Sequence, residues 1–224
     1  MPATRTPQLP GRRSLGQTGL AIASLVLLPP AAASAQPTAP ARLPPTPPQT
    51  TGPFYPVDWL GDVDADLVRM TGEAAQAQGI VTHLRGRVLD TGGAPLPGAL
   101  VEIWQCDALG RYRHPNDRKD GRDTAFQGRG RMATGTDGGF AFRTIRPVAY
   151  PGRTPHIHMA VLAAGRREPL VTQLYVAGEP LNERDGLFNR LRDPRQRDAV
   201  LLRLEPAGGI EPQALLARRD IVLG

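Results

Sequence analysis

Glycine and proline interrupt this chain so often that long helices have little room to form. The sequence contains 25 Gly and 24 Pro among 224 residues. Apolar or β-branched stretches bounded by Gly, Pro, Asn or Asp predict strands at 83–90, 99–106, 140–147, 156–163, 170–176, 200–205 and 220–223. Long helical stretches do not alternate with these strands, which disfavours a doubly wound parallel sheet. We therefore expect an all-β fold with a β-sandwich core.

The first 35 residues have the pattern of an export signal. Arg12 and Arg13 precede an apolar run at 20–28, and Ala33-Ser34-Ala35 fits the small-x-small rule for signal-peptide cleavage. The apolar run is too short to span a bilayer stably. Paired arginines are typical of twin-arginine signals, so we expect residues 1–35 to direct export by that route to the periplasm or beyond. An ordinary secretory leader with two adjacent arginines is the alternative.

Residues 36–56 are dominated by proline, which occupies eight of these 21 positions. Such a stretch cannot hold a helix or a central strand, so we expect an extended, polyproline-like tether. A globular domain should then occupy residues 57–224. Within it, residues 63–78 have a weakly helical pattern, which predicts a short helical segment at the start of the domain.

Charge and cysteine content exclude several kinds of protein. After removal of residues 1–35 the chain carries 24 basic and 21 acidic side chains, a net charge of +3. This charge is too small to indicate a nucleic-acid partner. The single cysteine, Cys106, excludes an internal disulfide framework and a cysteine-rich metal site.

A His-x-His pair lies in the predicted strand 156–163. Side chains at i and i+2 of a strand point to one face, so His156 and His158 can bind one metal ion while Ile157 packs on the other side. Taken alone the pair is a weak signal, because histidine also has structural roles. Imidazole suits zinc, copper and iron alike.

Two of the four tyrosines of the chain, Tyr112 and Tyr150, lie in the segments 101–114 and 144–158. The second of these segments also contains the His-x-His pair. Tyr112 ends a glycine turn that follows the predicted strand 99–106, and Tyr150 precedes the histidines by a few residues. Phenolate is a hard, anionic oxygen ligand, so two phenolates with two imidazoles would stabilise a ferric ion better than a soft or reducible site would.

The ordered motifs of the chain resemble those of the intradiol ring-cleavage dioxygenases, the family that includes catechol- and protocatechuate-cleaving enzymes. The resemblance spans residues 51–185. Its motifs are Thr51-Gly52-Pro53-Phe54-Tyr55, Gly86-Arg87-Val88-Leu89-Asp90, Trp104-x-x-Asp107-x-x-Gly110-x-Tyr112, Phe126-Gln127-Gly128-Arg129-Gly130, Thr144-Ile145-x-Pro147-x-x-Tyr150-Pro151, Arg153, His156-x-His158 and Thr172-Gln173-Leu174-Tyr175.

The resemblance implies one non-haem Fe(III) per chain and a catechol-type substrate that is cleaved with O2 to a cis,cis-muconate-type product. The implied metal ligands are Tyr112, Tyr150, His156 and His158. Tyr150 would also leave the metal and take a substrate proton. Arg153 would stabilise negative charge that develops on the ring, and Gln173 would line the pocket. We expect the ion to lie between the two sheets.

Two other kinds of protein have to be considered. A non-catalytic exported β-sandwich that binds a ligand would explain the export signal and the tether, but it has no need of two tyrosines beside His-x-His. A zinc hydrolase would combine the histidines with a carboxylate and a water, yet no acid lies close in sequence to His156. The resemblance implies neither a nucleic-acid partner nor a stable membrane span, and it allows an oligomer.

Overall fold

The computed structural model describes residues 42–118 and 120–224. The predicted signal peptide at 1–35 and the first part of the predicted tether, residues 36–41, lie outside these ranges. Within them, no helix is long and apolar enough to cross a membrane.

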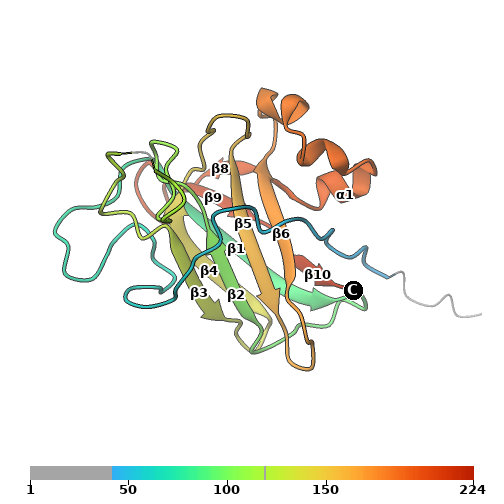
Figure 1. The fold of residues 1–224 in the computed structure, drawn as a ribbon. Helices are drawn as coiled ribbons and strands as arrows, with labels where there is room; N and C mark the ends of the chain where they lie inside the picture. Colours follow the sequence, from blue (N-terminus) through green and yellow to red (C-terminus); the bar gives the residue numbers. More distant parts are fainter. Residues whose placement is uncertain (1–41, 119) are drawn as a thin grey trace, which may run out of the picture. The chain divides into compact units, whose positions relative to one another are not determined.

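Ten strands of the described chain form two sheets. They are β1 (Val81–Asp90), β2 (Leu100–Trp104), β3 (Arg129–Ala133), β4 (Gly139–Ile145), β5 (His156–Leu162), β6 (Leu170–Val176), β7 (Leu201–Leu202), β8 (Leu204–Pro206), β9 (Leu215–Arg218) and β10 (Ile221–Leu223). In the first sheet, β4 pairs antiparallel with β1, while β9 and β10 pair parallel with β1 and β8 extends the sheet from β9. The second sheet has the order β3-β2-β5-β6-β7 (Figure 1).

The main hydrophobic core unites residues from both sheets. Leu84, Phe142 and Ile145 come from the first sheet, and residues such as Ile103 and Ile157 come from the second; all are almost completely buried. Each of these strands alternates inward and outward side chains, which is the pattern of a β-sandwich. The predicted fold class is confirmed.

Eight of the ten strands overlap the predicted ones, and the predicted strand 200–205 is divided. Its first part, β7, joins the second sheet, and β8 joins the first, so the chain changes sheets near Arg203. Two strands were not predicted. Strand β3 contains Gly130 between two arginines, and β9 has only four residues, so neither has a clear apolar alternation.

The prediction of a helical segment at 63–78 was wrong, because no helix forms there. Three aspartates bind backbone N–H groups that a helix would use. Asp62 accepts a hydrogen bond from the N–H of Thr71 (2.6 Å), and Asp64 and Asp66 each accept one from the N–H group two residues later (2.8 and 3.0 Å). Such local bonds favour turns over helix.

Three short helical elements lie between β6 and β7 in the chain. They are the 3-10 helices η1 (Pro180–Arg184) and η2 (Phe188–Arg190) and the helix α1 (Pro194–Asp198). At the start of α1, Asp193 accepts a hydrogen bond from the N–H of Arg195, and Pro194 occupies a position where a missing N–H costs nothing. These elements bring the chain from β6 to β7.

Gly86 gives a test of the packing between β1 and the C-terminal strands. A Cβ atom at this position would overlap the backbone carbonyl of Arg219, which cannot rotate away. Gly86→Ala should therefore lower the free energy of unfolding by about 3 kcal/mol, the upper range for overpacking a well-packed site. Gly209→Ala is the matched control, because a Cβ there meets nothing within 4 Å. Urea unfolding measures both variants, and equal losses would contradict this packing.

Candidate metal centre

The structure brings the four predicted metal ligands together. His156 and His158 lie on β5, and their Nε2 atoms face each other at 3.1 Å. Tyr112, in the loop after β2, has its ring centroid 5.6 Å from that of Tyr150 and 6.1 Å from that of His158. Tyr150, in the loop after β4, lies 5.6 Å from His156 by the same measure. All four rings thus face one small region.

This cluster lies on the outer face of the second sheet, so the expectation of a site between the sheets was wrong. Ile157 packs in the main core, and the pleat of β5 turns His156 and His158 to the opposite face. There His158 stacks on Trp104, with ring centroids 4.9 Å apart and the planes inclined by 9°. Trp104 and Tyr112 belong to a second, smaller apolar cluster.

Asp107 holds the loop that presents Tyr112. Its carboxylate accepts hydrogen bonds from the N–H groups of Leu109 and Arg111 (both 2.9 Å) and of Asp123 (2.8 Å). Gly110 has a φ of 72°, and a Cβ there would come within 3.3 Å of Tyr150. The motif Asp-x-x-Gly-x-Tyr therefore specifies a turn that lets the two tyrosines approach each other.

The donor atoms of the cluster suit a metal ion. The hydroxyl oxygen of Tyr112 is buried and forms no hydrogen bond with any described residue. Nδ1 of His156 donates to the carbonyl of Thr154 (2.6 Å), which leaves the lone pair of its Nε2 free. The two imidazoles and the two phenol groups offer nitrogen and hard oxygen donors, so the residues present fit the metal that the resemblance implies.

Burial keeps the four ligand candidates neutral in the absence of a cation. It raises the pKa of Tyr112 well above the ordinary value, an effect to which the adjacent Tyr150 adds. Burial also raises the pKa of Tyr150, although the positive charge of Arg153 opposes this. The pKa of His156 falls to about 4 and that of His158 falls well below its usual value, in both cases mainly through burial. A cation would have to displace the phenol protons, so its binding would release protons.

Arg153 lies beside Tyr150 and is held in place by two other groups. Its Nε donates to the buried carboxylate of Asp185 (2.8 Å), and its Nη2 donates to Oε1 of Gln173 (2.6 Å). The remaining Nη1 is 3.4 Å from the hydroxyl oxygen of Tyr150. The guanidinium group is therefore fixed with one edge toward the tyrosine cluster.

Asp185 is the anchor of this arrangement, and the sequence did not reveal it. Burial alone would raise its pKa, but hydrogen bonds from the N–H groups of Phe188 and Thr154 and from Arg153 outweigh burial and hold the pKa below its usual value. Asp185 thus stays charged and neutralises part of the charge of Arg153.

The described part of the predicted tether packs across the second sheet as a strap, residues 46–55 (Figure 1). The N–H of Gln49 donates to the carbonyl of Val171 on β6, and its Oε1 accepts from the hydroxyl of Tyr175 (2.6 Å). Nε2 of Gln173 donates to the carbonyl of Thr50 (2.9 Å). The strap therefore fixes the orientation of the Gln173 amide, whose oxygen faces Arg153.

The end of the strap covers the cluster itself. Phe54 stacks on Tyr112, with centroids 4.6 Å apart and an interplanar angle of 22°. A Cβ at Gly52 would lie 3.3 Å from the ring of His158, and φ there is 70°, so the close approach of the strap depends on glycine. Thr51-Gly52-Pro53-Phe54-Tyr55 was the sequence signal for this part of the site, whereas the role of Gln49 was missed.

A recess of about 240 Å³ opens beside the cluster. Its walls are formed by Tyr150, Gly152, Arg153, Thr154, Leu181, Arg184 and Asp185. Tyr150 is the one candidate ligand among these walls, so a small molecule in the recess would meet Tyr150 and Arg153.

The described residues hold no group of three or more His, Cys, Asp or Glu side chains that could bind a metal. The carboxylate that a zinc hydrolase would add to the two histidines is thus missing from the described part of this site, because Asp185 is engaged by Arg153 and backbone N–H groups. The oxygen donors beside the histidines come from tyrosines.

Comparison with known proteins matches this chain to dioxygenases. The family model described as Dioxygenase matches residues 50–205. The protocatechuate 3,4-dioxygenase beta chain of Burkholderia cepacia is 37% identical over 179 residues, which cover 76% of each chain. Catechol 1,2-dioxygenase of Acinetobacter baylyi is 31% identical over 161 residues, 64% of this chain and 50% of that protein. The chain thus spans only about half the length of this second relative.

Two solved structures share the fold over 80% of this chain. The dioxygenase domain of a dioxygenase and carbohydrate-binding fusion protein from Streptomyces sp. SirexAA-E has a TM-score of 0.63 and 37% identity, with 98% of that chain covered. Catechol 1,2-dioxygenase from Acinetobacter sp. ADP1 has a TM-score of 0.59 and 27% identity, with 62% of that chain covered.

Asp185→Asn tests the anchor of Arg153. The change keeps the side-chain shape but removes the charge, so the free energy of unfolding at pH 7 should fall by about 3 kcal/mol, as for other buried ion pairs that lose one partner. Because the folded-state pKa of Asp185 is lowered, its stabilising effect is present above the ordinary carboxyl pKa and is lost as the pH falls through the lowered value. The difference from wild type should therefore shrink in acid.

Asp198→Asn is the matched control, because Asp198 forms an exposed ion pair with Arg203 (3.0 Å). Asp198→Asn should lower the free energy of unfolding by less than about 1 kcal/mol. Chemical unfolding at neutral and acidic pH measures both variants. A loss for Asp185→Asn that is no larger than the control, or that does not change with pH, would contradict the role of this carboxylate.

Proposed function

This chain belongs to the intradiol ring-cleavage dioxygenase family, and from this premise we propose that it is an iron-dependent enzyme that opens a catechol-type ring between the two hydroxyl-bearing carbons. It would consume O2 and yield a cis,cis-muconate-type dicarboxylate. The observation that carries the proposal is the convergence of two tyrosines and two histidines next to an anchored arginine.

The proposed cofactor is one non-haem Fe(III), held by Tyr112, Tyr150, His156 and His158. Hard phenolate oxygens favour a ferric ion, and the two imidazoles complete the donor set. When bound, the ion would supply a Lewis-acidic centre that takes both catechol oxygens and prepares the ring to react with O2. The unpaired oxygen of Tyr112 and the facing Nε2 atoms support this assignment.

The two tyrosines would have different roles. Tyr112 is 4% exposed and is covered by Phe54, so it should remain a permanent ligand. Tyr150 is only partly buried and lines the recess, so its oxygen can accept a proton from a substrate hydroxyl as the substrate enters. Burial raises the pKa of Tyr150, so the protonated form would be favoured whenever no cation is bound to its oxygen.

Arg153 would stabilise negative charge as it develops on the substrate ring. Its guanidinium lies at the wall of the recess and is fixed by Asp185 and Gln173, so it need not reorganise during the reaction. Gln173, expected to line the pocket, is not among the walls of the recess and would act by orienting Arg153. We also propose that the enzyme acts outside the cytoplasm, on the basis of the twin-arginine pattern in residues 1–35.

Oxygen uptake with catechol-type substrates, combined with product analysis, tests the reaction. The iron-loaded full chain should consume one O2 for each ring opened and give the product cleaved between the two hydroxyl-bearing carbons. Tyr150→Phe should lower kcat by about 100-fold, the typical contribution of one proton-transfer group, and change the unfolding free energy little.

Tyr55→Phe is the matched control, because Tyr55 donates to Glu102 (2.8 Å) and is not among the proposed ligands. Its turnover should stay within about threefold of wild type. Cleavage beside the diol rather than within it, or equal effects of the two tyrosine changes, would contradict the proposal.

A further inference from the structure

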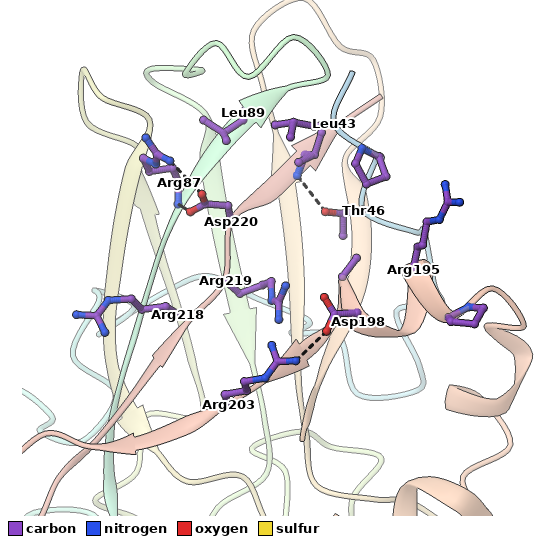
Figure 2. A pocket seen from close by; sticks show the side chains of 14 residues that line it. Leu43, Thr46, Arg87, Leu89, Arg195, Asp198, Arg203, Arg218, Arg219 and Asp220 are labelled. Carbon is purple, nitrogen blue, oxygen red and sulfur yellow. Dashed lines mark hydrogen bonds and ion pairs between the residues drawn. The ribbon is translucent and has the colours of Figure 1, made fainter. Parts of the chain in front are cut away.

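A second hollow shares no lining residue with the recess beside Tyr150. This arginine groove, about 990 Å³ in volume, lies between the first sheet, helix α1 and the start of the described chain (Figure 2). Its lining residues are Leu43, Pro44, Thr46, Arg87, Leu89, Pro194, Arg195, Asp198, Ala199, Arg203, Arg218, Arg219, Asp220 and Val222. Five arginines and two aspartates give the lining an excess of positive charge.

The acids of the groove do not satisfy all of its arginines. Asp220 pairs with Arg87 (3.2 Å), and Asp198 pairs with Arg203 (3.0 Å). Arg218 approaches Glu205, just outside the groove, at 3.8 Å. Among the described residues, Arg195 and Arg219 have no acidic partner within 4 Å, which leaves two positive charges for a ligand.

Arg219 is the half-buried member of this group. One of its terminal nitrogens donates to the carbonyl of Leu201, but its Nε is buried and has no hydrogen-bond partner among the described residues. Figure 2 shows the Arg219 and Arg203 side chains extending into the hollow on the side of Asp198.

Apart from Thr46, the rest of the lining is apolar. Leu43, Leu89 and Val222 line the hollow together with two prolines and an alanine. A volume near 1,000 Å³ lies at the upper end for small-molecule sites. The groove therefore combines guanidinium groups, which bind carboxylates in a planar fork, with walls that suit a hydrocarbon body.

We propose that the arginine groove is a binding site for an organic carboxylate with an apolar body. A nucleic acid or another long polyanion is disfavoured, because the chain after residue 35 carries a net charge of only +3. Residues 1–41 of the same chain are a poor charge match, because they contain arginines and no acid.

The test uses biphenyl-4-carboxylate as the probe and biphenyl-4-carboxamide as its neutral counterpart. Isothermal titration of the full chain should show saturable one-to-one binding of the carboxylate, and the amide should bind about tenfold more weakly or less. Arg219→Gln and Arg203→Gln should each weaken carboxylate binding about tenfold, as expected for the loss of one charge-assisted hydrogen bond. Amide NMR shifts should cluster at groove residues such as Ala199 and Val222.

Arg69→Gln is the matched control, because Arg69 is exposed, lies outside the groove and loses the same charge. The affinity of the Arg69→Gln variant for biphenyl-4-carboxylate should stay within about twofold of the wild-type value. Arg203 is exposed, so Arg203→Gln should fold even if Arg219→Gln does not. Arg203→Gln should leave ring-cleavage activity unchanged. Failure of the groove proposal can therefore be distinguished from failure of the proposed function.

Several results would overturn the proposal. They are the absence of saturable binding, equal affinity for the amide, groove variants that bind like wild type, or NMR shifts confined to the surroundings of His156. Complete displacement of the probe by equimolar sulfate would also overturn it, because the groove would then recognise charge alone.

Discussion

The pleat of strand β5 is the constraint on which both the core and the candidate site depend. Ile157 has to enter the main core, and this fixes His156 and His158 on the opposite face of the sheet. A slip of one residue in register would expose Ile157 and bury two imidazoles in the apolar core. The pairing of β5 with β2 and β6 on its two sides sets that register, so packing and metal-ligand position are specified by the same hydrogen bonds.

The outer face of the sheet then needs a cover, and segments distant in sequence provide it. The loops after β2 and β4 bring the tyrosines, while the strap places Phe54 over Tyr112 and fixes Gln173 through Thr50. Asp185, at the end of η1, accepts a hydrogen bond from Arg153 and fixes its position. Each side chain that would face a substrate is thus held by a second group, which is the arrangement that preorganised catalysis requires.

The sequence predicted the parts of the site that depend on local spacing. His156 and His158 follow from the period of a strand, and the glycine turn before Tyr112 is visible as Asp-x-x-Gly. Arg153 and Gln173 were identified only through resemblance to a family. Asp185 and Gln49 could not be inferred, because their hydrogen bonds link residues 32 and 126 positions apart. The helix expected at 63–78 does not form, because local hydrogen bonds to aspartate side chains outweigh a weak helical pattern.

We propose that Tyr112 and Tyr150 bind one ferric ion, and visible absorption of the iron-loaded full chain measures this binding. Phenolate-to-Fe(III) charge transfer should colour the wild-type protein. Tyr112→Phe and Tyr150→Phe should each shift and weaken the band without abolishing it, while zinc-loaded protein should be colourless. A colourless protein that nevertheless holds one ferric ion per chain, or a band that neither tyrosine change alters, would contradict the claim.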